Sequence, residues 1–277
     1  MSEHQPPNSG LTIEVENLVT HYGKRLILKG IDFGVRANEI MVVIGGSGSG
    51  KSTLMRHLLA LERPTSGSIR LLGQDITKLN TVSHTELYKN IGVAFQSGAL
   101  FSSMTVGENI MLPLSEHTKL DQATMEIMMR MKLEVVDLAG FENLMPAELS
   151  GGMIKRAALA RAIVMDPKIL FCDEPSAGLD PVVASALDDL LLRLRDAMHM
   201  SIVVVTHELD SAFKIADRIT VLDEGKILMV GTVDEIKAST NEHIQNILHR
   251  RTEEENLDAD AYLNRLTGID VGTTPPL

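Results

Sequence analysis

One stretch of the chain decides the fold, because it joins an apolar run to a glycine-rich loop and a helix. The run is IMVVI at residues 40–44, and the loop that follows reads Gly45, Gly46, Ser47, Gly48, Ser49, Gly50, Lys51, Ser52 and Thr53. The loop fits the pattern G-x-x-x-x-G-K-[ST], in which backbone N–H groups cradle phosphates, the lysine reaches the outer phosphates and the hydroxyl binds Mg²⁺. Helical residues continue to Ala60, and a helix N-terminus adds partial positive charge. The sequence therefore predicts a nucleotide-binding loop; the alternative is a glycine-rich turn without a ligand.

Length, charge and cysteine content narrow the class of protein. The 277 residues are enough to bury a substantial core. A net charge of −11 argues against a protein that holds nucleic acid by neutralising its phosphates. The polar, proline-rich start is unlike a signal peptide, and no apolar stretch approaches the roughly 20 residues that cross a bilayer. The single cysteine, Cys172, excludes an intramolecular disulfide. We expect a cytoplasmic protein whose membrane role comes through a partner.

Apolar runs alternate with helical segments along the chain. We expect strands at 11–15, 27–33, 68–72, 91–95, 169–172 and 202–205, with a helix over 181–198 between the last two. Buried apolar strands that alternate with helices predict an α/β fold with a parallel sheet. Residues 97–165 are rich in methionine and helical in pattern, which predicts a helical subdomain inserted into that sheet. Residues 1–10 have the composition of a disordered segment.

The strand at 169–172 ends in two carboxylates, Asp173 and Glu174. Ligands of a parallel sheet lie at the carboxyl ends of its strands, where the glycine-rich loop also lies. Asp173 can therefore reach Mg²⁺, and Glu174 can face the terminal phosphate and accept a proton from a water. The alternative is an acidic strand end that caps the next turn.

A second glycine-rich segment, Leu149-Ser150-Gly151-Gly152-Met153, precedes a helix expected over 154–164. Ser150 is a good N-cap, and the glycines leave backbone N–H groups exposed. The segment is either a capped helix start or a second anion cradle. Because one ATP needs only one cradle in a chain, the second interpretation predicts a homodimer in which each cradle closes on the other subunit's terminal phosphate.

Taken together, the motifs resemble those of ATP-binding cassette (ABC) transporter ATPases over residues 11–240. The family's six motifs occur in order: Walker A at 45–53, the Q-loop at Gln96, the signature at 149–153, Walker B at 169–174, the D-loop at 176–180 and the switch histidine at His207. The resemblance implies a P-loop NTPase with a RecA-like mixed sheet core (11–96 and 166–240), a helical subdomain (97–165) and a C-terminal extension (241–277). It also implies hydrolysis of ATP with Mg²⁺ by two copies that sandwich two nucleotides.

The resemblance assigns roles to three further residues. His207 would hydrogen-bond the γ-phosphate and report its presence; the alternative is a satisfied histidine at a strand end. Gln96 would contact Mg²⁺ or the attacking water and act as a hinge to the helical subdomain. Tyr22 stands where the family places an aromatic that stacks on adenine, although an ordinary loop aromatic fits the same pattern.

Three stretches narrow the resemblance to a subfamily. Residues 95–101, 113–118 and 149–162 resemble the MlaF group, the ATPases of the Mla system and of related MCE-type lipid transporters, and Met153 replaces the usual signature glutamine. This resemblance implies an MlaE-like integral membrane permease, an MlaD-like periplasmic protein with an MCE domain, often an MlaB-like STAS-domain protein, and phospholipid as cargo. It implies a peripheral position on the cytoplasmic side of the inner membrane.

Three rival functions differ in cargo or class. An ATPase of another importer, for polar solutes such as amino acids, would share the chemistry; Met153 and residues 97–101 argue against it. A soluble ABC protein of translation or DNA repair generally carries two cassettes or a long coiled-coil insertion. This chain has the motifs of one compact cassette and an acidic balance, which argue against that class. A nucleotide-gated binding module without turnover is disfavoured by the presence of Glu174 and His207.

The resemblance weakens beyond residue 240. Residues 241–251 can form a short helix with Ile244, Ile247 and Leu248 on one face. A second weak apolar stripe spans 261–266, and we expect residues 268–277 to be disordered. The tail either docks on a neighbouring subunit or partner, or is a solvated extension.

Overall fold

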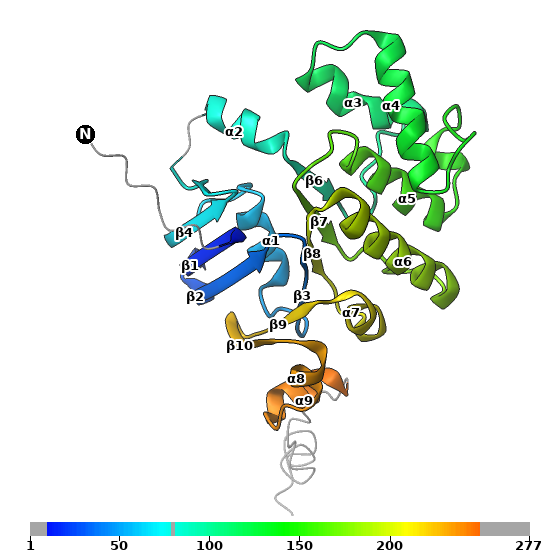
Figure 1. Ribbon diagram of the computed structural model, residues 1–277. Helices are drawn as coiled ribbons and strands as arrows, with labels where there is room; N and C mark the ends of the chain where they lie inside the picture. The colour runs from blue at the N-terminus through cyan, green and yellow to red at the C-terminus, as the bar shows by residue number, and fades with distance from the viewer. Residues whose placement is uncertain (1–9, 79–80, 250–277) are drawn as a thin grey trace, which may run out of the picture. The chain divides into compact units, whose positions relative to one another are not determined.

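The computed structural model describes residues 10–78 and 81–249 (Figure 1). The chain divides into two compact units, Met1–Ala238 and Ser239–Leu277. In chain order the elements of the first unit are β1 (Leu11–Tyr22), β2 (Arg25–Arg36), β3 (Ile40–Ile44), α1 (Lys51–Leu58), β4 (Ser66–Leu71), β5 (Gln74–Asp75), α2 (Thr81–Tyr88), β6 (Ile91–Ala94), α3 (Val106–His117), α4 (Gln122–Val135), the 3₁₀ turn Pro146–Glu148, α5 (Gly151–Ala162), β7 (Ile169–Asp173), α6 (Pro181–Met198), β8 (Ser201–Val205), α7 (Leu209–Ile215), β9 (Arg218–Asp223), β10 (Lys226–Gly231) and α8 (Val233–Lys237). Disorder is expected at 1–10 and 268–277 and an apolar stripe at 261–266; all of these residues except Gly10 lie outside the described residues.

The central sheet contains β3, the strand that leads into the glycine-rich loop. Within the described part of the chain its strand order is β10-β9-β3-β8-β7-β6, and every pair is parallel except β9 with the edge strand β10. All five residues of β3 are buried, because the strand lies between β8 and β9 and has both faces covered. The expected mixed sheet of an α/β fold is confirmed.

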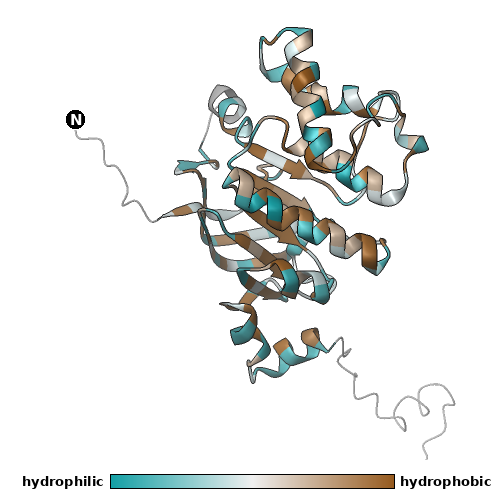
Figure 2. Cartoon of the chain, turned by 45° about the vertical axis from the view of Figure 1, so that its right-hand side comes forward, coloured by the Kyte–Doolittle hydropathy of each residue, from teal (hydrophilic) through white to brown (hydrophobic). Residues whose placement is uncertain are grey.

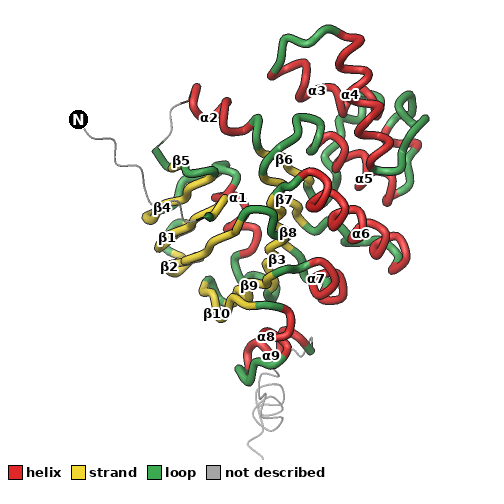
Figure 3. Tube along the Cα trace, viewed as in Figure 1, coloured by secondary structure: helices red, strands yellow, loops and turns green. Residues whose placement is uncertain are grey.

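The N-terminal strands form a separate antiparallel sheet with the order β2-β1-β4-β5 (Figure 3). The prediction of one parallel sheet was therefore wrong for the strands expected at 11–15, 27–33 and 68–72. Strand β1 is also longer than predicted and carries bulges along its pairing with β2. A tight hairpin with Gly23 at a φ of 60° joins β1 to β2, which forces an antiparallel pairing.

The main core lies between the antiparallel sheet, α1 and the central sheet. Figure 2 shows the central strands as largely hydrophobic. Ile13 of β1, Leu28 of β2, Leu54 of α1 and Phe171 of β7 belong to one cluster of buried residues. Complete burial of a side chain as large as that of Phe171 stabilises the fold by about 2–3 kcal/mol. This packing holds α1, and with it the glycine-rich loop, at the carboxyl end of β3.

Cys172, next to Phe171, is fully buried, and burial raises the pKa of its thiol to about 12. The thiol is therefore protonated at neutral pH, and the side chain serves as a small buried hydrophobe.

Helices α3, α4 and α5 pack on one another, and α5 also contacts β6 and α6. In Figure 1 they lie to one side of the central strands. Each begins at a residue that caps it: Thr105 in a capping box with Glu108, Asp121, and Ser150. Helix α5 begins at Gly151 rather than at the predicted residue 154. The Ser150 hydroxyl accepts a hydrogen bond from the Met153 N–H at 3.3 Å, so both signature glycines lie in the first helical turn.

The second unit contains α9 (Glu242–Leu248) among its described residues, 239–249. The Asn241 side chain caps it by accepting a hydrogen bond from the Ile244 N–H at 3.3 Å. A helix is confirmed within the predicted range 241–251, but it ends at Leu248, and residues 250–251 lie outside the described residues. Across the described residues of both units, no helix has the length and apolar character needed to cross a membrane.

Candidate nucleotide-binding site

The glycine-rich loop joins β3 to α1 and is closely packed at one end and open at the other. A Cβ on Gly45 would lie 2.0 Å from the Leu222 carbonyl oxygen, so only glycine fits there. A Cβ on Gly46 or Gly48 would meet nothing within 4 Å. The Ser49 hydroxyl is buried and has no hydrogen-bond partner among the described residues. An open loop of backbone amides at a helix N-terminus has the form of a phosphate cradle.

Lys51 is the first residue of α1 and lies over this loop. Its Nζ donates hydrogen bonds to the Gly45 oxygen at 2.8 Å and the Gly46 oxygen at 2.9 Å. Burial lowers the pKa of Lys51, and the negative charges of Glu174 and Asp173 oppose that decrease. The fold therefore brings the loop lysine and the two predicted carboxylates into one electrostatic site.

Glu174 follows β7 in a constrained conformation. Its φ is 47°, a left-handed conformation that is uncommon for a residue with a side chain. Its N–H donates to the Val205 oxygen at 2.8 Å. The Thr206 hydroxyl donates to Glu174 Oε2 at 2.9 Å, and His207 Nδ1 lies 2.7 Å from Oε1. Glu174 and His207 therefore lie at the same edge of the central sheet.

Asp173 and Gln96 line one open depression together with Ala177. Burial and the neighbouring Glu174 raise the pKa of Asp173, while Lys155 and Lys51 oppose that increase. In the described part of the chain, no group of three or more His, Cys, Asp or Glu side chains is placed to hold a metal. One carboxylate and one hydroxyl, Asp173 and Ser52, fit Mg²⁺ that is also held by phosphate oxygens, because that ion prefers few protein ligands.

The signature segment is separate from the loop of its own chain. Among the residues described, no hydrogen bond or ion pair joins 149–153 to 45–53. Gly151 is exposed, and a Cβ there would meet only Leu179, at an ordinary 3.7 Å. A Cβ on Gly152 would lie 2.7 Å from Val183 Cγ1. The amides at the start of α5 are therefore accessible to a group from outside the chain.

Tyr22 ends β1 with 46% of its surface exposed. Its hydroxyl donates to Glu62 Oε2 at 2.6 Å, and Arg56 NH1 donates to Glu62 Oε1 at 2.9 Å. The ring is thus held at its hydroxyl end while much of its surface stays exposed. Stacking on adenine remains a prediction.

Two residues that contact Glu174, Thr206 and Lys155, are not predicted as site residues from the sequence. The Thr206 hydroxyl binds one carboxylate oxygen of Glu174. Thr206 follows β8 directly and precedes His207, and this position is the sequence feature that could have revealed its role. Lys155 Nζ donates to the Glu174 carbonyl oxygen at 3.1 Å and to the Gln96 carbonyl oxygen. Its contacts depend on the packing of α5 against the sheet, which no local pattern predicts.

Comparisons with known proteins agree with this geometry. The chain is 37% identical over 236 residues to the intermembrane phospholipid transport system ATP-binding protein MlaF of Haemophilus influenzae, covering 85% of this chain and 89% of that protein. It is 38% identical over 247 residues to the methionine import ATP-binding protein MetN of Mannheimia succiniciproducens, covering 88% and 71%. A dimeric ATP-binding cassette, solved in a post-hydrolysis state with ADP and Pi, superposes with a TM-score of 0.73 at 28% identity, covering 80% of this chain and 98% of the other.

The model of one family matches more than half of the chain. It is described as ABC transporter and matches residues 28–177, from β2 to the D-loop. The matched range includes the phosphate cradle, the signature helix and both carboxylates. The chain therefore belongs to the ABC transporter family, as the ATP-binding, ATP-hydrolysing subunit of such a transporter.

Proposed function

We propose that this ATPase drives the movement of phospholipids between the inner and outer membranes, as the energy-supplying subunit of an Mla-type transporter. The identity of the cargo is inferred from the signature LSGGM and the stretches 95–101 and 113–118, together with the similarity to MlaF. The identity to the methionine importer is equally high, so overall identity does not separate the two cargoes. An importer of polar solutes remains the second candidate for that reason.

The chemistry proposed is attack of water on the γ-phosphate of ATP. Lys51 and the amides of Gly45–Thr53 hold the β- and γ-phosphates, and Tyr22 stacks on adenine. Glu174 orients the water and accepts its proton, while His207 and Gln96 contact the γ-phosphate and the water. Ser52, Asp173 and Gln96 would hold Mg²⁺, which when bound neutralises charge on the phosphate oxygens. Catalysis then consists mainly of positioning and charge stabilisation.

We further propose that two copies enclose two ATP molecules, with Ser150, Gly151 and Gly152 of each copy closing on the γ-phosphate bound to the other. The outward accessibility of Gly151 and the absence of a described contact with the chain's own loop support this arrangement. A dimer is also the state in which the superposed cassette was solved. In this account the core (11–96 and 166–240) binds nucleotide, and the helical subdomain (97–165) presents the signature.

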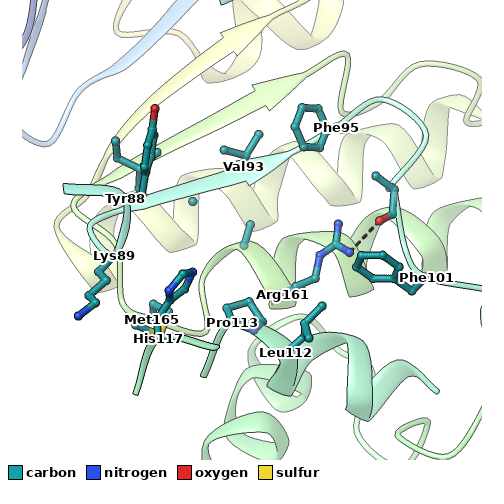
Figure 4. Close-up of a pocket in the computed structure, with 14 residues that line it drawn as sticks. Tyr88, Lys89, Val93, Phe95, Phe101, Leu112, Pro113, His117, Arg161 and Met165 are labelled. Atoms are coloured by element: carbon teal, nitrogen blue, oxygen red, sulfur yellow. Dashed lines mark hydrogen bonds between the residues drawn. The ribbon is translucent and has the colours of Figure 1, made fainter. Parts of the chain in front are cut away.

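The helical subdomain offers a surface for the permease. An open groove is lined by the end of α2, β6, α3, α5 and the loop after β6, and its lining includes Tyr88, Val93, Phe95, Phe101 and Pro113 (Figure 4). We propose that an MlaE-like permease docks here, which places the ATPase on the cytoplasmic face of the inner membrane. MlaD-like and MlaB-like proteins would join through the permease or the ATPase.

The loop that carries Phe101 is held in place from within. Asn109 of α3 is fully buried; its Oδ1 accepts from the Phe101 N–H at 2.8 Å, and its Nδ2 donates to the Phe101 oxygen at 3.1 Å. Arg161 donates to the Ala99 oxygen at 2.7 Å and the Gly98 oxygen at 2.9 Å. An exposed aromatic on a rigid loop is typical of an interface anchor, because little entropy is lost on binding.

Phe101→Asp is expected to abolish co-purification of the permease from membranes, because it places a charge in the apolar groove, while ATP binding stays within about threefold of wild type. A typical buried aromatic anchor contributes about 2–4 kcal/mol to binding. Phe141→Asp is the matched control, since Phe141 is also an exposed phenylalanine of the helical subdomain but does not line the groove. Equal permease recovery with both variants would contradict the docking site.

Affinity purification from native membranes tests partner and cargo together. We expect an integral membrane permease, an MCE-domain protein and bound phospholipid to co-elute with the wild-type protein. Recovery of a permease with a solute-binding protein and no phospholipid would favour the importer of polar solutes instead.

A further inference from the structure

Lys155 links the signature helix to the catalytic edge of the sheet. It lies in the second turn of α5, and its Nζ donates hydrogen bonds to two backbone carbonyl oxygens, those of Gln96 and Glu174. Gln96 follows β6 and Glu174 follows β7, two parallel neighbours in the central sheet. One ammonium group therefore connects three separate segments of the chain.

The helix that carries Lys155 begins at the signature cradle. Ser150 caps α5, and Lys155 follows five residues later, about 7.5 Å along the axis at the α-helical rise. On the proposed function, Ser150 serves the nucleotide of the partner subunit, while Lys155 contacts residues of its own site. A rigid helix of this length transmits a shift at one end to the other.

The surroundings of Lys155 suit a positioning role. The side chain is half-buried, and burial lowers the pKa of Lys155 while Glu174 and Asp173 oppose that decrease. Burial of an ammonium is costly unless hydrogen bonds and opposite charges compensate. Here both are present, so the side chain is held in one place rather than free in solvent.

The two carbonyl groups that Lys155 contacts belong to Gln96 and Glu174, and the proposed roles of these residues at the ATP site depend on the position of their backbones. Glu174 has the left-handed φ of 47° described above, a conformation that persists only where its surroundings hold it. Its N–H is fixed by Val205 and its carbonyl by Lys155, so both ends of the residue are held. Gln96 has its carbonyl fixed by the same ammonium.

We propose that Lys155 is a positioning residue that fixes the backbones of Gln96 and Glu174 relative to the signature helix, so that the placement of the helical subdomain sets the geometry of the catalytic centre. This inference rests on the proposed roles of Gln96 and Glu174. Lys155 acts through those residues and contacts no reacting atom.

Lys155→Met, which keeps the length of the side chain but removes its charge and donors, tests the proposal. We expect kcat to fall by about 10- to 100-fold, because a misplacement of about 1 Å at a reacting group costs up to about 10²-fold. The KM for ATP is expected to stay within about threefold, because the loop and Lys51 are unaffected. Lys155→Arg retains a charge and several donors, and should recover at least one third of the wild-type kcat.

Lys132→Met is the matched control. Lys132 lies in α4 of the same subdomain, and its side chain is 13% exposed, but it pairs with Asp166 at 2.5 Å, and none of its described contacts is with Gln96 or Glu174. The kcat of Lys132→Met should stay within twofold of wild type, and the Tm of Lys132→Met should fall at least as much as that of Lys155→Met. A kcat for Lys155→Met within twofold of wild type would overturn the proposal. So would equal losses in Lys155→Met and Lys132→Met, or no recovery in Lys155→Arg.

Two further measurements keep the test decisive. If Lys155→Met does not fold, Lys155→Gln replaces it: its shorter amide cannot span both carbonyls, so the same loss of kcat is expected, and full activity would overturn the proposal. Wild type and Glu174→Gln are assayed in parallel. ATP hydrolysis by wild type that disappears in Glu174→Gln supports the proposed function whatever the Lys155 variants do, so the two can fail separately.

Discussion

Replacing Glu174 with glutamine is expected to lower the ATP turnover rate by about 10²- to 10⁴-fold, the range for loss of a general base. Glutamine keeps the shape of the side chain and can still accept the hydrogen bond from Thr206, but its amide cannot take a proton from water. The geometry explains why the loss should be specific to chemistry. The carboxylate lies at the end of β7 beside His207, whereas phosphate binding depends on the separate loop at 45–53.

ATP binding should therefore survive in Glu174→Gln, with a Kd within about threefold of wild type in a direct titration. Glu86→Gln is a matched control, because Glu86 is an exposed carboxylate paired with Lys89 and lies outside the site. Near-normal turnover by Glu174→Gln, or an equal loss in Glu86→Gln, would remove Glu174 from the proposed role.

Replacing Lys51 with alanine is expected to raise the Kd for ATP by about 10²-fold or more. A hydrogen bond to a charged group contributes about 1.5–3 kcal/mol, and Lys51 can offer several to the β- and γ-phosphates. A loss of about 3 kcal/mol corresponds to slightly more than 10²-fold in Kd. The Lys51 ammonium donates to the Gly45 and Gly46 oxygens, which places it over the loop.

Isothermal titration of Lys51→Ala with ATP and with ADP checks this prediction. Lys89→Ala serves as the control, since Lys89 pairs with Glu86 and does not belong to the glycine-rich loop. The loss should be larger for ATP than for ADP, because only ATP carries the γ-phosphate. Unchanged affinity in a folded Lys51→Ala protein would contradict the assignment of the loop.

Some parts of the site are predictable from sequence. They depend either on a local motif or on the rule that the carboxyl ends of parallel strands form the ligand-binding edge of a sheet. The cradle at 45–53 is contiguous and follows a buried strand, so its position needs no knowledge of distant contacts. The meeting of Glu174 and His207 follows because both residues come after parallel, adjacent strands, β7 and β8. The capping of α5 by Ser150 is equally local, although the helix begins three residues earlier than predicted.

What could not be predicted depends on contacts between distant segments. The strands at the N-terminus were assigned to the central sheet, because an apolar alternation reveals a strand but not its neighbours. Their antiparallel sheet is defined by pairs such as Val15 with Phe33 and Val15 with Ile69. The contacts of Lys155 depend likewise on how α5 packs against the loops after β6 and β7. A lysine in a helix gives no signal that it will be half-buried between two carbonyls.

The central claim is that ATP joins two copies of this chain through the signature segment. The most direct measurement is the mass of Glu174→Gln in solution, by sedimentation velocity, with and without ATP and Mg²⁺. We expect ATP to double the mass, and addition of Gly151→Asp to abolish that doubling. A Cβ on Gly151 would meet Leu179 only at an ordinary 3.7 Å, so we expect the new carboxylate to act by repelling the partner's γ-phosphate. A protein that stays monomeric with ATP, or a dimer that forms equally well with Gly151→Asp, would contradict the account.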